Sequence, residues 1–236
     1  MKATDVKSSL EAIASSERAF LSQRFFKTGE GEYGEGDVFM GITVPTLRLI
    51  AKASIKLPLD EVEKLLQEKY HECRVTALLI LVERFKKAIE SDRGAIATLY
   101  LRNTHRINNW DLVDLSAHYI LGKYLMDKDR SILHQLADST WLWDQRIAVI
   151  STFEFIRNGD YTDNLILAEK LLNHRHDLMH KAIGWMLREI GKRNKSVELD
   201  FLMQFSIRMP RTMLRYAIEK FPEEERQFFL KRKHEE

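Results

Sequence analysis

An aromatic ring and a carboxylate stand four residues apart in the stretch 108–114, which heads an apolar run. If Asn108 or Asn109 is the N-cap of a helix here, Trp110 and Asp114 share one face of that helix. The alternative is a purely structural role as the start of a helix, in which the ring anchors the first turn and acidic side chains interact with the helix dipole. The spacing alone does not decide between a site and a helix start.

Composition favours a helical protein with a substantial core. The chain has 236 residues, of which 44% are hydrophobic, and it contains only 10 glycines and 4 prolines. That length suits one or two domains, and short β-branched runs do not recur between turn signals. We therefore expect an all-α protein and a single domain over residues 1–236.

The charge balance and the single cysteine exclude several classes of protein. A net charge of +2 and a pI near 8.5 are only mildly basic, so the placement of the charges matters more than their sum. Cys73 alone allows neither an internal disulfide nor a multi-cysteine metal cage, and we expect it to be a buried thiol. The N-terminus does not resemble a signal peptide, and no apolar run approaches the ~18 residues of a membrane span. We expect a soluble cytoplasmic monomer without a cofactor.

The pattern of the N-terminal region predicts helices followed by a glycine-rich loop. Apolar residues recur at helical spacing from about residue 8 to 27, with a break near Ser15 and Ser16 that predicts a second helix start. Residues 28–37 hold four of the ten glycines and must form a loop. This loop lacks the Lys-Ser/Thr ending of a nucleotide-binding loop, so we reject a nucleotide site. Pro45 then marks the first turn of the next helix.

A repeat appears in the remaining chain. A basic residue followed by small and apolar residues recurs at Arg74, Arg146 and Lys181, and Asp111 occupies the equivalent place between the first two. The spacings are 37, 35 and 35 residues, close to the ~40 of HEAT-type helical repeats. Each repeat helix follows another amphipathic helix. The sequence therefore predicts a right-handed α-solenoid of HEAT-like helix pairs with a concave basic groove.

Equivalent helices of such a stack line its concave surface. The side chains expected to face the groove are Arg74, Trp110, Asp114, Arg146, Lys181, Trp185 and Arg188, and a last helix pair adds Arg211 and Arg215. Cations neutralise phosphates and aromatic rings pack on sugars or bases, so the groove suits a nucleic-acid backbone. A carboxylate would repel phosphate, but it would help an enzyme whose substrate gains positive charge. Cleavage of an N-glycosidic bond, with its oxocarbenium-like deoxyribose, has that property.

Other aromatic and histidine residues have plainer interpretations. We expect Trp141 or Trp143 to be a core residue, because tryptophan in a helical stack is usually buried. Three histidines cluster at positions 174, 176 and 180, and His176 and His180 could meet one helical turn apart. A metal site would need a third ligand beside these two and supporting contacts, so we expect no metal. A basic tail at 231–233 is expected to be a solvated end.

Four ordered blocks of this sequence resemble the bacterial DNA alkylation repair family, the AlkD-type alkylpurine DNA glycosylases. The blocks are Asn-Trp-Asp-Leu-Val-Asp at 109–114, Leu-Trp-Asp-Gln-Arg at 142–146, 180–189 around Trp185, and 210–217 around Arg211. The resemblance covers nearly the whole chain, including the turn at 41–45.

The resemblance implies a HEAT-like stack that holds duplex DNA on its concave face. It also implies removal of cationic N3- or N7-alkylated purines without flipping of the base, unlike most base-modifying enzymes. Carried over by motif, Trp110 and Trp185 contact the deoxyribose of the lesion, and Asp114 stabilises the sugar cation and positions water. Arg146 then holds the backbone phosphate, and Arg188 is a further DNA contact.

The sequence departs from the family at one position and leaves alternatives open. Characterised members contribute an N-terminal tyrosine to the lesion site, and the best match here is Phe25, which can pack on the sugar but has no hydroxyl group. The glycine-rich loop is also longer than the corresponding loop of a characterised member. Some relatives bind branched DNA without glycosylase activity, so a non-catalytic binder of damaged or branched DNA is the alternative. A third hypothesis is a helical-repeat scaffold that binds another protein, and it predicts no salt-dependent affinity for DNA.

Overall fold

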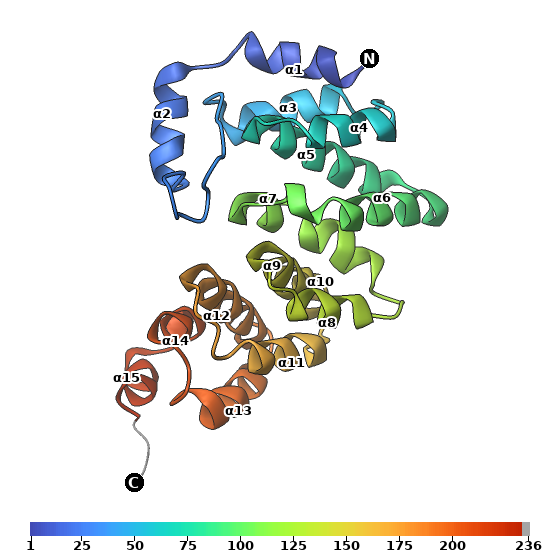
Figure 1. Cartoon of the computed structure of the whole chain (residues 1–236). Coiled ribbons are helices and arrows are strands. Elements are labelled where there is room, and N and C mark those ends of the chain that lie inside the picture. Colours follow the sequence, from blue (N-terminus) through green and yellow to red (C-terminus); the bar gives the residue numbers. More distant parts are fainter. Residues whose placement is uncertain (233–236) are drawn as a thin grey trace. The chain divides into compact units, whose positions relative to one another are not determined.

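The computed structural model describes residues 1–232, and its regular elements are helices (Figure 1). No strand occurs in this range; one isolated parallel bridge joins Val38 to Tyr70. The prediction of an all-α protein is therefore confirmed for the described chain, while Lys233 of the expected tail lies outside it. Within the same range no helix is both long and apolar enough to cross a membrane.

The chain divides into two compact units, Met1–Tyr124 and a second that begins at Leu125. Consecutive helices pair within each unit as the repeat predicts, for example α4 (Leu59–Leu66) with α5 (His71–Lys87) in the first unit. In the second unit α8 (Ser131–Asp138) pairs with α9 (Leu142–Ser151). The right-handed solenoid and the single domain stay predictions.

The first two helices begin where capping residues allow. α1 (Ala3–Glu11) starts earlier than the apolar pattern suggests, because Glu61 accepts a hydrogen bond from the backbone N–H of Ala3 at 2.7 Å. α2 (Ser16–Phe25) starts at the predicted break, where the Ser15 hydroxyl accepts from the backbone N–H of Arg18. The expected second helix start is thus confirmed.

The glycine-rich stretch forms the predicted loop and runs back beside α2 (Figure 1). It ends at Gly41, whose φ of +78° lies in the left-handed region. A Cβ atom at this position would lie 2.3 Å from the carbonyl oxygen of Ser15, so only glycine lets the loop pass the start of α2. α3 (Val44–Ala53) follows, with Pro45 in its first turn as predicted.

The helix α5 is the centre of the first unit. It packs against α3, α4, α6 (Glu90–Arg102) and α7 (Trp110–Asp114). Figure 1 shows α5 between these helices. Apolar residues lie on nearly all its faces, and such a helix is stable only when surrounded. Cys73 is buried here as predicted, and burial raises the pKa of its thiol to about 12.

The apolar run headed by residues 108–114 does not form one continuous helix. α7 ends at Asp114, and a π-helical turn, η2 (His118–Gly122), follows. The Ser116 hydroxyl donates to the carbonyl of Leu112 at 2.5 Å and lies 3.0 Å from the hydroxyl of Tyr100. A serine bonded to the carbonyl four residues earlier competes with regular helix, which explains the break.

The second unit is arranged around α12 (Asp177–Gly191). Its other helices after α9 are α10 (Phe153–Arg157), α11 (Thr162–Lys170), α13 (Lys195–Phe205), α14 (Arg211–Ala217) and α15 (Glu223–Lys231). α12 packs against α9, α10, α11, α13 and α14. A Cβ atom at Gly184 would lie 2.4 Å from the carbonyl oxygen of Met213, so this glycine lets α14 approach α12 closely.

Candidate functional site

Trp110 belongs to an aromatic wall at the start of α7. The Asn109 side-chain oxygen accepts a hydrogen bond from the backbone N–H of Trp110 at 2.9 Å, which confirms Asn109 as the N-cap. The Phe26 ring stacks on the indole at a centroid distance of 5.5 Å, and Phe25 meets it edge-on at 6.0 Å. Phe25 is 65% exposed, whereas Trp110 is half-buried. We call Phe25, Phe26 and Trp110 the aromatic wall.

Asp114 is the last residue of α7, one helical turn after Trp110, and it is half-buried. The spacing places both side chains on the same side of this short helix. The structure thus brings Phe25 next to Trp110, with Asp114 on the same helix as Trp110. The role of these residues as a site stays a prediction. Phe26 was missed, although it is the immediate neighbour of Phe25 and could have been suspected from the Phe-Phe pair.

A buried polar cluster lies behind the aromatic wall. The imidazole of His71, at the start of α5, is within hydrogen-bonding distance of two carboxylates: Nδ1 is 3.1 Å from Asp37, and Nε2 is 2.8 Å from Asp111. His71 is 2% exposed. The ring of Phe26 lies 5.1 Å from the imidazole, and that of Phe39 lies 4.6 Å from it. We call the Asp37, His71 and Asp111 contact the His71 bridge.

Asp37 is the centre of this cluster because four side chains donate to it. The amides of Asn108 and Asn109 each donate at 3.2 Å, and the Arg74 guanidinium forms a buried ion pair with the same carboxylate. No sequence motif described above includes Asp37 or His71 among the site residues. No local signal identifies them, because their partners are more than 30 positions away along the chain.

The structure corrects the prediction for Arg74. Its side chain is 2% exposed, and besides Asp37 it bonds the carbonyl oxygens of Glu68 and Lys69 at 3.3 and 3.0 Å. The repeat pattern placed a basic residue on a groove, but the carboxylate of Asp37 holds this one inside the unit. Arg74 is therefore a structural group and is not exposed for contact with DNA.

Within the His71 bridge, His71 and Asp37 have strongly displaced pKa values. Burial by itself lowers the pKa of His71, but the charge and hydrogen bond of Asp111, with the hydrogen bond to Asp37, raise it to about 9. Burial by itself raises the pKa of Asp37, but the hydrogen bond with His71 and the charge of Arg74 lower it to about 2. At neutral pH the bridge therefore holds a protonated imidazole between two carboxylates.

In the second unit, α12 carries three of the predicted residues on one side. Lys181 pairs with Asp177 at 2.7 Å, and Arg188 forms an ion pair with Glu219. The half-buried indole of Trp185 lies between them in sequence, with the ring of Phe153 at 5.8 Å. Their shared helix face is as predicted.

The remaining predicted arginines differ in exposure. Arg146 on α9 is 4% exposed, and its guanidinium donates to the carbonyl of Leu178 at 2.6 Å. Arg211 and Arg215 on α14 are exposed, and Arg211 donates to the carbonyl of Leu230 at 2.9 Å. Contact of any of these side chains with DNA stays a prediction.

The histidine cluster and one of the two neighbouring tryptophans have structural roles. Nδ1 of His176 accepts from the backbone N–H of Leu178 at 3.1 Å and caps α12, and Nε2 of His174 is 2.8 Å from the Gln145 side-chain oxygen. Trp143 is 2% exposed, as expected for a core residue, and Trp141 is 44% exposed. Burial lowers the pKa of His174.

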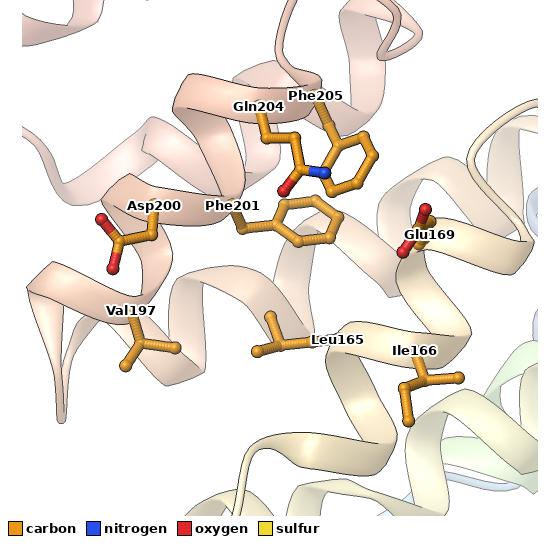
Figure 2. A pocket seen from close by; sticks show the side chains of 8 residues that line it. All are labelled: Leu165, Ile166, Glu169, Val197, Asp200, Phe201, Gln204 and Phe205. Atoms are coloured by element: carbon orange, nitrogen blue, oxygen red, sulfur yellow. The ribbon is translucent and has the colours of Figure 1, made fainter.

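A groove of about 320 Å³ lies between α11 and α13 (Figure 2). Leu165, Ile166 and Glu169 line it from α11; Val197, Asp200, Phe201, Gln204 and Phe205 line it from α13. Its surface is mainly apolar, and it includes none of the predicted site residues. The groove therefore does not replace the aromatic wall and Asp114 as the candidate site.

Comparison with known proteins supports a family assignment. Residues 6–221 match the family described as DNA alkylation repair enzyme. A solved structure, described as a predicted DNA alkylation repair enzyme from Enterococcus faecalis, matches with a TM-score of 0.72 and 17% identity over 89% of this chain and 97% of that chain. No curated protein matches the sequence. Because the family match spans most of the sequence, the chain belongs to the DNA alkylation repair enzyme family.

Proposed function

We propose that this protein is a DNA glycosylase that hydrolyses the N-glycosidic bond of cationic N3- or N7-alkylated purines in duplex DNA, without flipping the base. The observation that carries the proposal is the half-buried carboxylate of Asp114, one helical turn from Trp110 and its aromatic wall. Membership of the DNA alkylation repair enzyme family supports a role in repair of alkylated DNA.

The carboxylate suits the charge that develops during this reaction. When the bond between C1′ and the purine nitrogen breaks, its electron pair leaves with the base and neutralises the cationic purine, while the deoxyribose becomes positive. Asp114 would stabilise that sugar cation. The oxygen of a water molecule then bonds to C1′, and its proton passes to the carboxylate or to solvent. The aromatic wall would pack on the sugar.

A cationic substrate also explains why one carboxylate is sufficient. An alkylated purine already carries the positive charge that a general acid would otherwise supply to the leaving group. The site therefore needs no second acid beside the base. We expect release of 7-methylguanine and 3-methyladenine and no release of unmodified adenine or guanine.

The basic side chains of the second unit would bind the DNA backbone. The proposed phosphate contacts are Arg146, Lys181, Arg188, Arg211 and Arg215, and Trp185 is proposed to provide a second ring for the sugar. Two of these side chains would have to give up contacts within the unit to bind a phosphate: Arg188 its ion pair with Glu219, and the buried Arg146 its hydrogen bond to the carbonyl of Leu178. We propose that a monomer is sufficient for the reaction.

The test is release of free base from methylated duplex DNA. Wild-type protein should release 7-methylguanine, detected by chromatography, under single-turnover conditions. Asp114→Asn removes the charge at nearly constant size and should slow release by about a hundredfold or more, with DNA affinity changed less than about twofold. Asp127→Asn, at an exposed aspartate, is the matched control and should behave as wild type.

Two results would contradict parts of the proposal. Unchanged release by Asp114→Asn would remove this carboxylate from the mechanism. No release by the wild type, together with tight binding to DNA junctions, would favour the non-catalytic binder of damaged or branched DNA.

A further inference from the structure

We propose that His71 is a positioning residue: its bridge between Asp37 and Asp111 fixes the first turn of α7, and with it the orientation of Trp110 and Asp114. This inference rests on the proposed function of the α7 site. His71 itself is 2% exposed and touches no substrate, so its effect would act through α7 alone.

The helix α7 needs an external support because it has only five residues. So short a helix is not stable by itself. Asp111 supplies the connection: one carboxylate oxygen accepts from the backbone N–H of Leu112 at 2.8 Å, inside the first turn, and the other lies 2.8 Å from Nε2 of His71. The same carboxylate therefore joins the first turn of α7 to the start of α5.

Asp37 supports the same turn from the other side. It accepts hydrogen bonds from Asn108 and Asn109, the two residues that precede α7, as well as bonding His71. Its own position is fixed because the next segment is attached to α5. The buried carboxylate of Glu72 accepts from the backbone N–H groups of Met40, Gly41 and Ile42 at 2.8, 2.7 and 3.3 Å.

Ring packing gives a second connection between the bridge and the site. The imidazole of His71 lies 5.1 Å from Phe26, and Phe26 stacks on Trp110 at 5.5 Å. Phe39 packs on both His71 and Phe26, at 4.6 and 5.0 Å. A displaced imidazole would therefore disturb the ring that holds the indole of Trp110.

The charges of the cluster balance only when the imidazole is protonated. The groups in direct contact with it are the carboxylates of Asp37 and Asp111, and the guanidinium of Arg74 pairs with Asp37. Arg106 makes no direct contact in this set but interacts electrostatically with Asp37 and Arg74. The four groups in direct contact carry two negative and two positive charges when His71 is protonated, and without that proton one negative charge is left uncompensated in a buried place. The raised pKa of His71, about 9, agrees with this balance.

The test compares His71→Gln and Asp111→Asn with His105→Gln, a control at an exposed histidine of the same unit. Excision of 7-methylguanine is measured in single turnover, and the indole N–H resonance of Trp110 is followed by NMR after assignment with Trp110→Phe. Both bridge variants should slow excision on the order of tenfold, with DNA affinity changed less than about twofold, because misplaced groups lose rate more than binding. Both should also shift the Trp110 resonance.

The pH profile separates positioning from a merely structural role. Wild-type excision should be independent of His71 titration between pH 6 and 8, since the imidazole stays protonated there. In Asp111→Asn the pKa of His71 should fall because a carboxylate is lost, so the rate should decrease as pH rises through that range. Imidazole resonances of His71 report the same titration directly.

Unchanged excision and an unchanged Trp110 resonance in both bridge variants would overturn the inference. If His71→Gln does not fold, as judged by circular dichroism, Asp111→Asn decides. If the wild type releases no base, the proposed function fails, whereas the Trp110 shift and the His71 titration still decide whether the bridge positions α7.

Discussion

The buried ionisable groups around His71 make the stability of the first unit depend on pH at both ends of the scale. The pKa of Asp37 falls from 3.8 to about 2 on folding, so its stabilisation is present above pH 3.8 and is lost as pH falls toward 2. The pKa of His71 rises from 6.5 to about 9, so its stabilisation is complete below pH 6.5 and is lost as pH rises through 9. Between these limits the bridge contributes fully.

Replacing Asp37 tests this charge balance. Asp37→Asn leaves the cations of His71 and Arg74 without their shared partner, and we expect a loss of about 3–5 kcal/mol in the free energy of unfolding at pH 5.5. Urea denaturation measures the loss, and Asp60→Asn, at an exposed carboxylate paired with Lys64, is the control. The loss should shrink at pH 9, where the wild-type bridge is itself weakened. An equal loss at both pH values would contradict the assigned protonation of His71.

Single residues were predictable from sequence when their role depended on near neighbours. The Asn109 cap and the spacing of Trp110 and Asp114 depend only on residues within one helical turn, so the local sequence is sufficient to predict them. Arg74 was assigned wrongly because its role depends on Asp37, 37 positions earlier. A buried counter-ion from another segment converts an apparent surface cation into a core group, and no local pattern reveals it.

At the scale of elements, α13 carries a buried carboxylate that opposes its own packing. Glu198 is 1% exposed, and its Oε1 finds no hydrogen-bond partner within residues 1–232. Burial raises the pKa of Glu198 to about 8, against the opposing charges of Lys195 and Arg188. Below pH 4.5 the carboxyl is protonated in both the folded and the unfolded chain and costs no stability. As pH rises from 4.5 through 8, the unfolded chain loses the proton first, so the buried carboxyl lowers the free energy of unfolding.

Glu198→Gln should remove that cost. The amide is uncharged at all pH values, so the variant should have a higher Tm than the wild type at pH 8 and nearly the same Tm at pH 5. Differential scanning calorimetry at the two pH values measures both differences. Glu169→Gln, at an exposed glutamate on α11, should change neither Tm. A lower Tm for Glu198→Gln at pH 8 would mean that the ionised carboxylate has a stabilising partner.

Element boundaries followed the same rule of locality. Ser15 and Pro45 mark helix starts through their own backbone preferences, and the structure places those starts as predicted. The early end of α7 was not predictable, because the bond from Ser116 to Leu112 is joined by Tyr100 from α6. That contact exists only after α6 and the following segment have packed.

At the scale of the whole molecule, the repeat makes one prediction that packing inside each unit does not test. The aromatic wall and Asp114 belong to the first unit, and Trp185 with the proposed phosphate contacts belongs to the second. The proposed function requires both indoles to contact the same lesion. The family match runs across both units.

A double-mutant cycle on excision tests that requirement in the full-length protein. Trp110→Ala and Trp185→Ala should each slow release of 7-methylguanine by at least about tenfold, because each removes a surface that orients the sugar. If both rings hold one deoxyribose, loss of the first removes most of the value of the second, and the double variant should be much faster than the product of the single effects implies. Trp141→Ala, at an exposed tryptophan, is the control. Effects that multiply would show that the two indoles act independently, and the two units would then not share a lesion site.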